Sequence, residues 1–103
     1  MYRIQILPLA HRDMQKTVEY ISIELSNPDA ALDWLDALEE SLDMLKDFPY
    51  AHPLHTLPYT LPSETRFYPV KKYLVFYVVI EPERIVEIRR VIYARMDIKG
   101  VSL

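Results

Sequence analysis

Cysteine is absent from this chain, glycine occurs once, and long apolar runs are missing. Without cysteine there is no disulfide framework, no thiol nucleophile and no thiolate metal site. The single glycine, Gly100, leaves no glycine-rich loop to cradle a phosphate, which excludes the common nucleotide-binding motifs. His52 and His55 lie close together in a proline-rich stretch without a third ligand nearby, so we predict neither a metal site nor a cofactor.

The N-terminal stretch MYRIQILPLAHRDM has no apolar run like that of a signal peptide. No apolar run elsewhere approaches the roughly 18 residues that a membrane-spanning helix requires. We therefore expect a soluble, cytoplasmic protein without a membrane partner.

The charge of the chain is unevenly distributed. The length of 103 residues suits a single domain over residues 1–103, and 50% hydrophobic with 26% charged residues is an ordinary globular balance. Residues 1–51 carry four Lys/Arg against ten Asp/Glu, whereas residues 52–103 carry eight against five. The strongly basic balance of many nucleic-acid-binding proteins is absent, but a local basic surface on the C-terminal half is not excluded.

The first half of the chain predicts one strand and two helices. Tyr2–Leu7 alternates between two faces, as a half-buried strand does. Apolar residues spaced three and four apart then predict an amphipathic helix from Leu9 to about Leu25. After a break at Ser26–Asp29, where Asn27 is a good N-cap, a second helix should run from Pro28 to about Asp47. The short link predicts an antiparallel helical hairpin.

An acidic stripe runs along the second predicted helix beside its apolar stripe. Such a row of carboxylates is either a solvated face or a surface that steers a basic partner. The stripe comprises Asp29, Asp33, Asp36, Glu40, Asp43 and Asp47.

The second half predicts a proline-rich loop followed by three strands in series. The loop spans Pro49–Thr65, and the strands are Arg66–Val70, Tyr73–Glu81 and Arg84–Ala94. Because Tyr73–Ile80 is apolar at every position, both of its faces should be covered. We predict an α+β fold in which the helical hairpin packs on one face of a four-stranded, mostly antiparallel sheet. The other face is left for the loop, the tail or a partner.

The last strand supplies the candidate binding residues. If no bulge interrupts its alternation, Arg89, Tyr93 and Arg95 lie on the same face of the sheet. Arginine forks and a tyrosine can hold a phosphate or a carboxylate-rich peptide. The alternative is structural, with Arg89 paired to Glu87 or to helix carboxylates and Tyr93 packed in the sheet.

Several segments in a fixed order carry a family resemblance. They are YRIQILPLAHRDM, the helical hairpin, LKDFPYAHPL, RFYPVKKYLVFYVV and VEIRRVIYARMD. In this order they resemble the RelE/ParE superfamily, the toxins of bacterial type II toxin–antitoxin pairs. The resemblance implies a compact toxin that is neutralised by an antitoxin wrapped across its sheet and helices, with operator DNA reached only through the antitoxin. RelE-like members cleave messenger RNA in the ribosomal A site, whereas ParE-like members poison DNA gyrase.

Three features place the chain closer to the ParE-like, plasmid-stabilisation branch. Tyr73 is followed by Leu74 rather than by the arginine of the nuclease branch, and 96–103 contains neither tyrosine nor histidine. Only Arg95 matches a basic residue of a nuclease site. We therefore expect a non-enzymatic, growth-inhibiting toxin that binds gyrase and a cognate antitoxin.

Two alternatives stay open: a RelE-like, ribosome-dependent endoribonuclease with Arg95 as its catalytic residue, and a non-toxic module that only binds an antitoxin. In each case the predicted binding residues are Arg66, Lys71, Lys72, Arg89, Tyr93 and Arg95.

Overall fold

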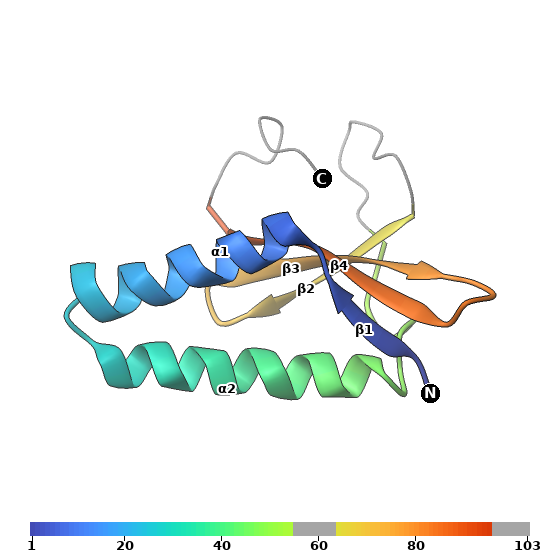
Figure 1. Ribbon diagram of the computed structural model, residues 1–103, viewed down its shortest axis with the longest axis horizontal. Helices are drawn as coiled ribbons and strands as arrows, with labels where there is room; N and C mark the ends of the chain where they lie inside the picture. Colours follow the sequence, from blue (N-terminus) through green and yellow to red (C-terminus); the bar gives the residue numbers. More distant parts are fainter. Residues whose placement is uncertain (55–63, 96–103) are drawn as a thin grey trace.

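The computed structural model describes residues 1–54 and 64–95 (Figure 1). Predictions that involve His55, part of the proline-rich loop or the tail at 96–103 lie outside these residues. The elements in chain order are β1 (Arg3–Ile6), α1 (Pro8–Glu19), the π-helical turn η1 (Tyr20–Glu24), α2 (Pro28–Leu45), β2 (Thr65–Val70), β3 (Tyr73–Ile80) and β4 (Ile85–Tyr93). The predicted α+β class and element order are confirmed. Within the described ranges, no helix is both long and apolar enough to span a bilayer.

The four strands form one mixed sheet with the order β1-β4-β3-β2. Among the three C-terminal strands each runs antiparallel to its neighbour, as predicted, and β1 joins the edge parallel to β4. A parallel neighbour needs a long crossover, and the helical hairpin provides part of that connection. Because β2, β3 and β4 alternate in direction, the β2–β3 turn and the β3–β4 turn lie at opposite ends of the sheet (Figure 1).

The helices start where local chemistry predicts. Pro8 occupies the first turn of α1, and Asn27 Oδ1 accepts the backbone N–H of Ala30 at 3.1 Å to cap α2. The predicted α-helix to Leu25 is wrong in its last turn, because the N–H of Leu25 reaches the carbonyl of Tyr20 at 3.1 Å. Ser22 Oγ donates to the carbonyl of Val18 at 2.7 Å, and such back-bonding competes with the helical ladder.

One face of the sheet packs under both helices. The core joins Trp34, Leu38 and Leu45 of α2 to alternate residues of β3 and β4. Trp34 and Leu45 are 1% exposed and Leu38 is fully buried. This layer is the hydrophobic core that the two periodicities predict.

A bulge at Arg89 interrupts the alternation of β4. The register pairs Phe76 with Arg90 but Tyr77 with Ile88, which leaves Arg89 without an opposite residue. One inserted residue reverses the face of the sheet to which the side chain of each later residue of the strand points. Val91 consequently joins the helix-facing core, and the prediction that Arg89 and Tyr93 share a face is wrong.

The other face of the sheet is apolar at its centre. Phe76 is fully buried there, and its ring stacks on Phe67 at 6.0 Å between centroids. Val78 and Ile92 are also buried, at 7% and 3% exposure. The centre of this face is therefore apolar and buried, and the uninterrupted alternation that would have placed Arg89 and Tyr93 on it together does not occur.

Candidate functional site

A groove of about 730 Å³ lies between two walls. One wall is α1 together with η1, and the other is the start of β3 together with the end of β4. Its lining is mainly apolar and aromatic, with cationic side chains from α1 and from the β2–β3 turn. The lining residues are Asp13, Lys16, Thr17, Tyr20, Ile21, Leu25, Ala30, Trp34, Lys71, Lys72, Tyr73, Arg90, Val91, Ile92 and Tyr93. Size and lining are those of a ligand or partner site.

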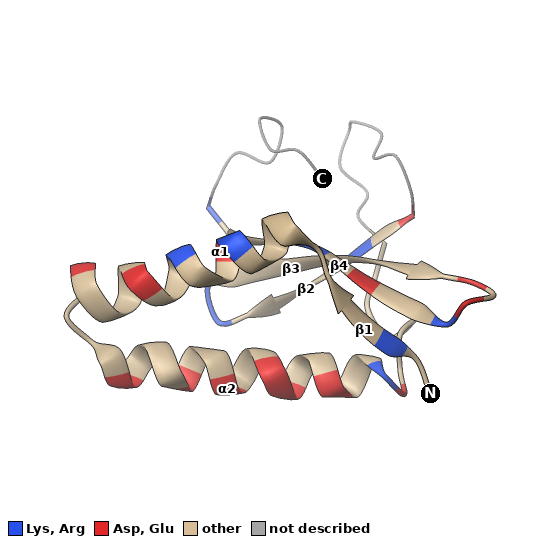
Figure 2. Ribbon diagram, in the orientation of Figure 1, with Lys and Arg blue, Asp and Glu red and all other residues tan. Residues whose placement is uncertain are grey.

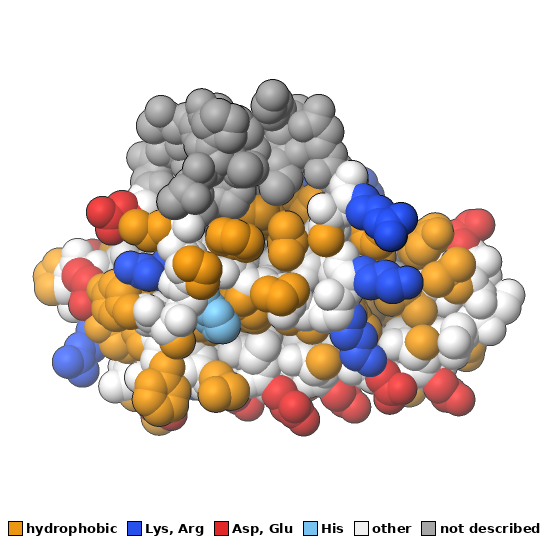
Figure 3. Space-filling model, turned by 180° about the vertical axis from the view of Figure 1, so that it is seen from behind, with side chains coloured by type: hydrophobic (Ala, Val, Ile, Leu, Met, Phe, Trp, Pro, Cys, Tyr) orange, Lys and Arg blue, Asp and Glu red, His pale blue; other side chains and the backbone are white. Residues whose placement is uncertain are grey.

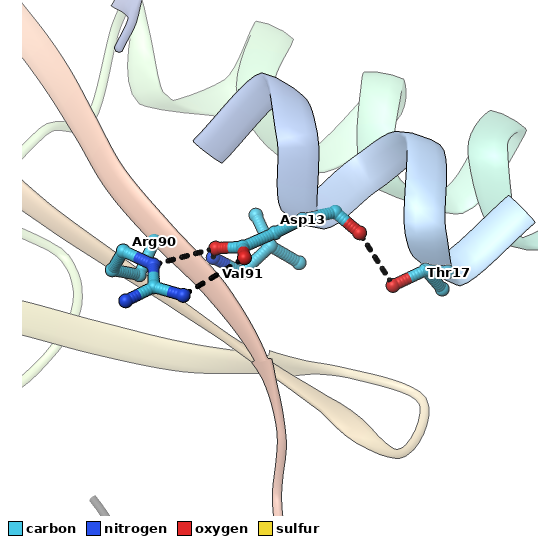
Figure 4. Close-up of polar contacts among 4 residues, drawn as sticks. All are labelled: Asp13, Thr17, Arg90 and Val91. Atoms are coloured by element: carbon cyan, nitrogen blue, oxygen red, sulfur yellow. Dashed lines mark hydrogen bonds and ion pairs between the residues drawn. The ribbon is translucent and has the colours of Figure 1, made fainter. Parts of the chain in front are cut away.

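Asp13 holds the helical wall of this groove against the sheet (Figure 4). Its carboxylate accepts Arg90 Nε at 2.7 Å and Arg90 Nη2 at 2.9 Å. It also accepts the backbone N–H of Val91 at 3.0 Å. Because β1 ends at Ile6, this edge of β4 has no strand partner at Val91, and the carboxylate satisfies it instead. The hydrogen bond with Asp13 also raises the pKa of Arg90, which secures the ion pair.

Aromatic rings form the interior of the groove. The ring of Tyr73 lies 5.4 Å from Trp34 and 5.5 Å from Tyr93, measured between centroids. Burial raises the pKa of Tyr73, and its hydrogen bond with Thr17 opposes that shift. Trp34 Nε1 is buried without a hydrogen-bond acceptor among the described residues. An unpaired buried donor costs about 1–3 kcal/mol.

Exposed cations border the groove. Lys71 and Lys72 form the turn between β2 and β3, and Lys71 has a left-handed backbone with φ of 55°. The backbone N–H of Ala94 donates to the carbonyl of Lys72 at 2.8 Å, so Arg95 follows close to the same turn. Within residues 1–54 and 64–95, the side chains of these lysines and Arg95 form no ion pair.

The other two predicted binding residues are engaged elsewhere. Arg66 Nη1 donates to the carbonyl of His52 at 2.8 Å, and its guanidinium lies 5.0 Å from the centroid of the Tyr50 ring. Arg89 Nε donates to Glu87 Oε1 at 2.7 Å. The structure thus gathers Lys71, Lys72, Tyr93 and Arg95 at one end of the sheet and separates Arg66 and Arg89 from them.

A second aromatic group, which we term the tyrosine cluster, ties residues 46–54 to the sheet. It consists of Tyr2, Tyr50, Tyr68 and Tyr77. The hydroxyls of Tyr2 and Tyr50 both donate to Glu81 Oε2, at 2.8 and 3.2 Å. The bond to Glu81 raises the pKa of Tyr2, while burial and the same carboxylate raise that of Tyr50.

The inner half of the tyrosine cluster is equally well paired. Tyr77 donates to the carbonyl of Pro49 at 2.7 Å, and the hydroxyls of Tyr68 and Ser41 lie 2.9 Å apart. Burial raises the pKa of Tyr68 to about 12. The His52 ring stacks on Tyr68 at 4.2 Å, and burial lowers the pKa of His52. These pairings give the cluster a structural role.

Carboxylates dominate the outer face of α2 (Figure 2). Seen from behind, acidic side chains line the lower edge of the molecule, and apolar ones spread over the middle of that face (Figure 3). Asp43 pairs with Lys46 at 3.0 Å in an exposed contact. No group of three or more His, Cys, Asp or Glu that could hold a metal ion occurs in the described ranges.

Sequence reasoning missed the helical half of the groove. No function was predicted from the sequence for Trp34, Lys16 or Tyr20, and all three line the groove. The available signal was that Tyr73 and Tyr93 should pair across the hairpin, and that the only tryptophan of the chain lies on the helix covering it.

Comparisons with known proteins agree with this architecture. Residues 4–98 match the family model described as "ParE toxin of type II toxin-antitoxin system, parDE". A solved structure titled "Chromosomal ParDE TA system from P. aeruginosa" is similar, with a TM-score of 0.73 and 15% sequence identity. The match covers 92% of this chain and 98% of that chain, and at this identity it shows the shared fold. No curated protein matches the sequence.

Proposed function

The chain belongs to the family of ParE toxins of type II toxin–antitoxin systems, and from this we propose that it inhibits growth by binding DNA gyrase. A cognate antitoxin neutralises it, and the pair meets operator DNA only through the antitoxin. The observation that carries the proposal is the family match over residues 4–98. The protein acts in the cytoplasm, where gyrase is found.

Three arginine side chains are already engaged in internal contacts, which favours a protein target over RNA. Arg66, Arg89 and Arg90 are held by internal contacts. RNA cleavage needs a positioned base and acid as well as several cations for the phosphates. A groove of aromatic and aliphatic side chains with a cationic rim instead suits the apolar anchors of a protein partner.

We place the binding surface of the toxin at the groove end of the sheet. Lys71, Lys72, Tyr93 and Arg95 are exposed there, with Tyr93 at 37%. Arg66 and Arg89, the remaining members of the predicted set, contribute indirectly by fixing residues 46–54 and the bulge of β4.

The proposal is tested by gyrase supercoiling with the purified protein. We expect inhibition at micromolar concentrations, relieved by the product of a neighbouring gene that encodes a DNA-binding domain and a helical tail. Lys72→Glu and Tyr93→Ala should each reduce inhibition at least tenfold, about 1.4 kcal/mol of binding free energy. Arg3→Glu, an exposed cation on β1, is the matched control and should leave inhibition unchanged. Absence of inhibition by the folded protein would refute gyrase as the target.

One observation supports the second candidate, a ribosome-dependent endoribonuclease. Arg95 is exposed beside the cationic Lys71–Lys72 turn, an arrangement that could engage a phosphate. The test is cleavage of A-site messenger by the wild type and its loss in Arg95→Ala; intact messenger removes this candidate. If expression leaves growth unchanged, the protein is instead a non-toxic antitoxin-binding module.

A further inference from the structure

We propose that the groove is also a small-molecule site for an apolar carboxylate, meaning an aromatic or branched-alkyl body that carries one anionic group. The inference does not rest on the proposed function, because it concerns only the chemistry of the groove. It assigns the body of the ligand to the aromatic interior and its carboxylate to the lysine rim.

The interior fits an apolar body of small-molecule size. A volume of about 730 Å³ lies within the range of small-molecule sites, roughly 300–1,000 Å³. Trp34 and Val91 line it although they are only 1% and 2% exposed, so the groove reaches the core layer under the helices. Tyr73 and Tyr93 add ring faces and edges, against which an aromatic or branched-alkyl group gains contact area.

The charges at the groove select an anion. Lys16 borders it on the α1 side, and Lys71 and Lys72 border it on the turn side. The groove-lining carboxylate, Asp13, is already neutralised by Arg90. Uncompensated ammonium groups therefore surround an apolar interior, and they attract an anionic group placed at the rim.

The donor types favour a carboxylate over a phosphate. The guanidinium group among the lining residues belongs to Arg90, and it already donates two hydrogen bonds to the carboxylate of Asp13. The lysines among the lining residues thus offer ammonium groups on flexible stems, whereas the guanidinium of Arg95 lies beside the turn and is not part of the lining.

Trp34 permits a direct test because it is the only tryptophan in the chain and lines the groove. Its fluorescence is followed while the full-length protein is titrated with phenylbutyrate and, separately, with the neutral analogue phenylbutanol. We expect a saturable change with phenylbutyrate and a dissociation constant on the order of 0.1 mM, as suits a ligand of this size. Phenylbutanol should bind about tenfold more weakly.

A charge-matched pair of variants locates the anion. Lys71→Gln/Lys72→Gln removes two charges at the groove, and Arg3→Gln/Arg84→Gln removes two at the other end of the sheet. The lysine pair should weaken phenylbutyrate binding about tenfold and leave phenylbutanol unchanged, whereas the arginine pair should alter neither. Circular dichroism confirms that both variants are folded.

Each contrary outcome overturns the proposal. They are the absence of a saturable change at millimolar phenylbutyrate, equal affinities for the acid and the alcohol, and equal weakening by the two double variants. If an acidic peptide with apolar side chains saturates the Trp34 signal while phenylbutyrate does not, the groove is a protein-docking surface and the small-molecule assignment fails.

Discussion

The two ends of the sheet use the same residue types in opposite ways. At the β3–β4 turn, the hydroxyls of Tyr2 and Tyr50 share Glu81, and Arg84 lies over the Tyr2 ring at 5.7 Å. At the β2–β3 turn, by contrast, aromatic rings line an open groove and the neighbouring lysines extend into solvent. The difference teaches that tyrosines and cations mark a binding surface only where internal contacts leave them available.

The largest expected effect comes from separating the groove wall from the sheet. Asp13→Ala leaves the mostly buried Arg90 without its carboxylate and the N–H of Val91 without an acceptor, which should cost about 3 kcal/mol of unfolding free energy. Urea unfolding measures the loss. Asp33→Ala, an exposed carboxylate on α2, should change stability by less than about 0.5 kcal/mol. If the two variants are equally stable, the Asp13 contacts do not hold α1 in place.

The next test concerns Tyr68 of the tyrosine cluster, whose hydroxyl lies 2.9 Å from that of Ser41. Its pKa is raised from 10.0 to about 12, so above pH 10 the unfolded chain releases a proton that the folded state retains. The associated stabilisation is present below pH 10 and is lost as pH rises to about 12, which corresponds to about 2.7 kcal/mol. Tyr68→Phe cannot titrate, so its stability should fall less steeply over this window.

Unfolding measured at pH 8, 10 and 11.5 by stopped-flow circular dichroism would test the Tyr68 prediction, with Ser41→Ala as the control. That variant removes the hydroxyl partner of Tyr68, at about 1 kcal/mol, but keeps the titrating group. It should therefore retain the alkaline loss. Parallel pH profiles for the wild type and Tyr68→Phe would contradict the assignment.

Local sequence signals were enough to predict the elements other than the π-helical turn η1. Asn27 and Pro28 specify the start of α2, and the apolar run Tyr73–Ile80 identifies the central strand because both of its faces are in fact covered. The bulge at Arg89 could not be predicted in this way, since an inserted residue resembles its neighbours and its effect depends on the partner strand. That single residue moved Tyr93 to the helix-facing side.

The groove was only partly predictable for the same reason. Lys71 and Lys72 are adjacent in sequence and were recognised together. Lys16, Tyr20 and Trp34 belong to other elements and reach the site through tertiary packing and through a π-helical turn that apolar spacing cannot distinguish from an α-helix.

A third prediction compares the backbones of the two turns. Lys71 and Arg84 both have left-handed φ values, 55° and 59°, at opposite ends of the sheet. Glycine relieves such strain, so Lys71→Gly should raise the unfolding free energy by about 1 kcal/mol. Arg84→Gly gains the same relief but loses the contact over Tyr2, worth about 0.5–1 kcal/mol, and should be close to neutral.

Urea unfolding compares these two glycine variants, and Lys71→Gly should also weaken phenylbutyrate binding. A variant that is more stable yet binds less well would show that the side chain of Lys71 contributes to binding and not to stability. Equal stabilisation by both substitutions would mean that Arg84 contributes nothing through Tyr2.

The smallest expected effect concerns His52, whose ring stacks on Tyr68 of the tyrosine cluster. Burial lowers its pKa below 6.5, so the folded state resists protonation while the unfolded chain accepts a proton. The stabilisation from neutral His52 is therefore present above pH 6.5 and is lost as pH falls through the lowered folded-state pKa.

His52→Phe keeps an aromatic ring against Tyr68 and cannot titrate. The stability difference between wild type and variant, from urea unfolding at pH 5 and pH 8, should shift toward the variant at pH 5. The other titrating groups are common to both proteins and cancel in this difference. A difference independent of pH would place the ring of His52 in contact with water, and the tyrosine cluster would then be less closed than its contacts imply.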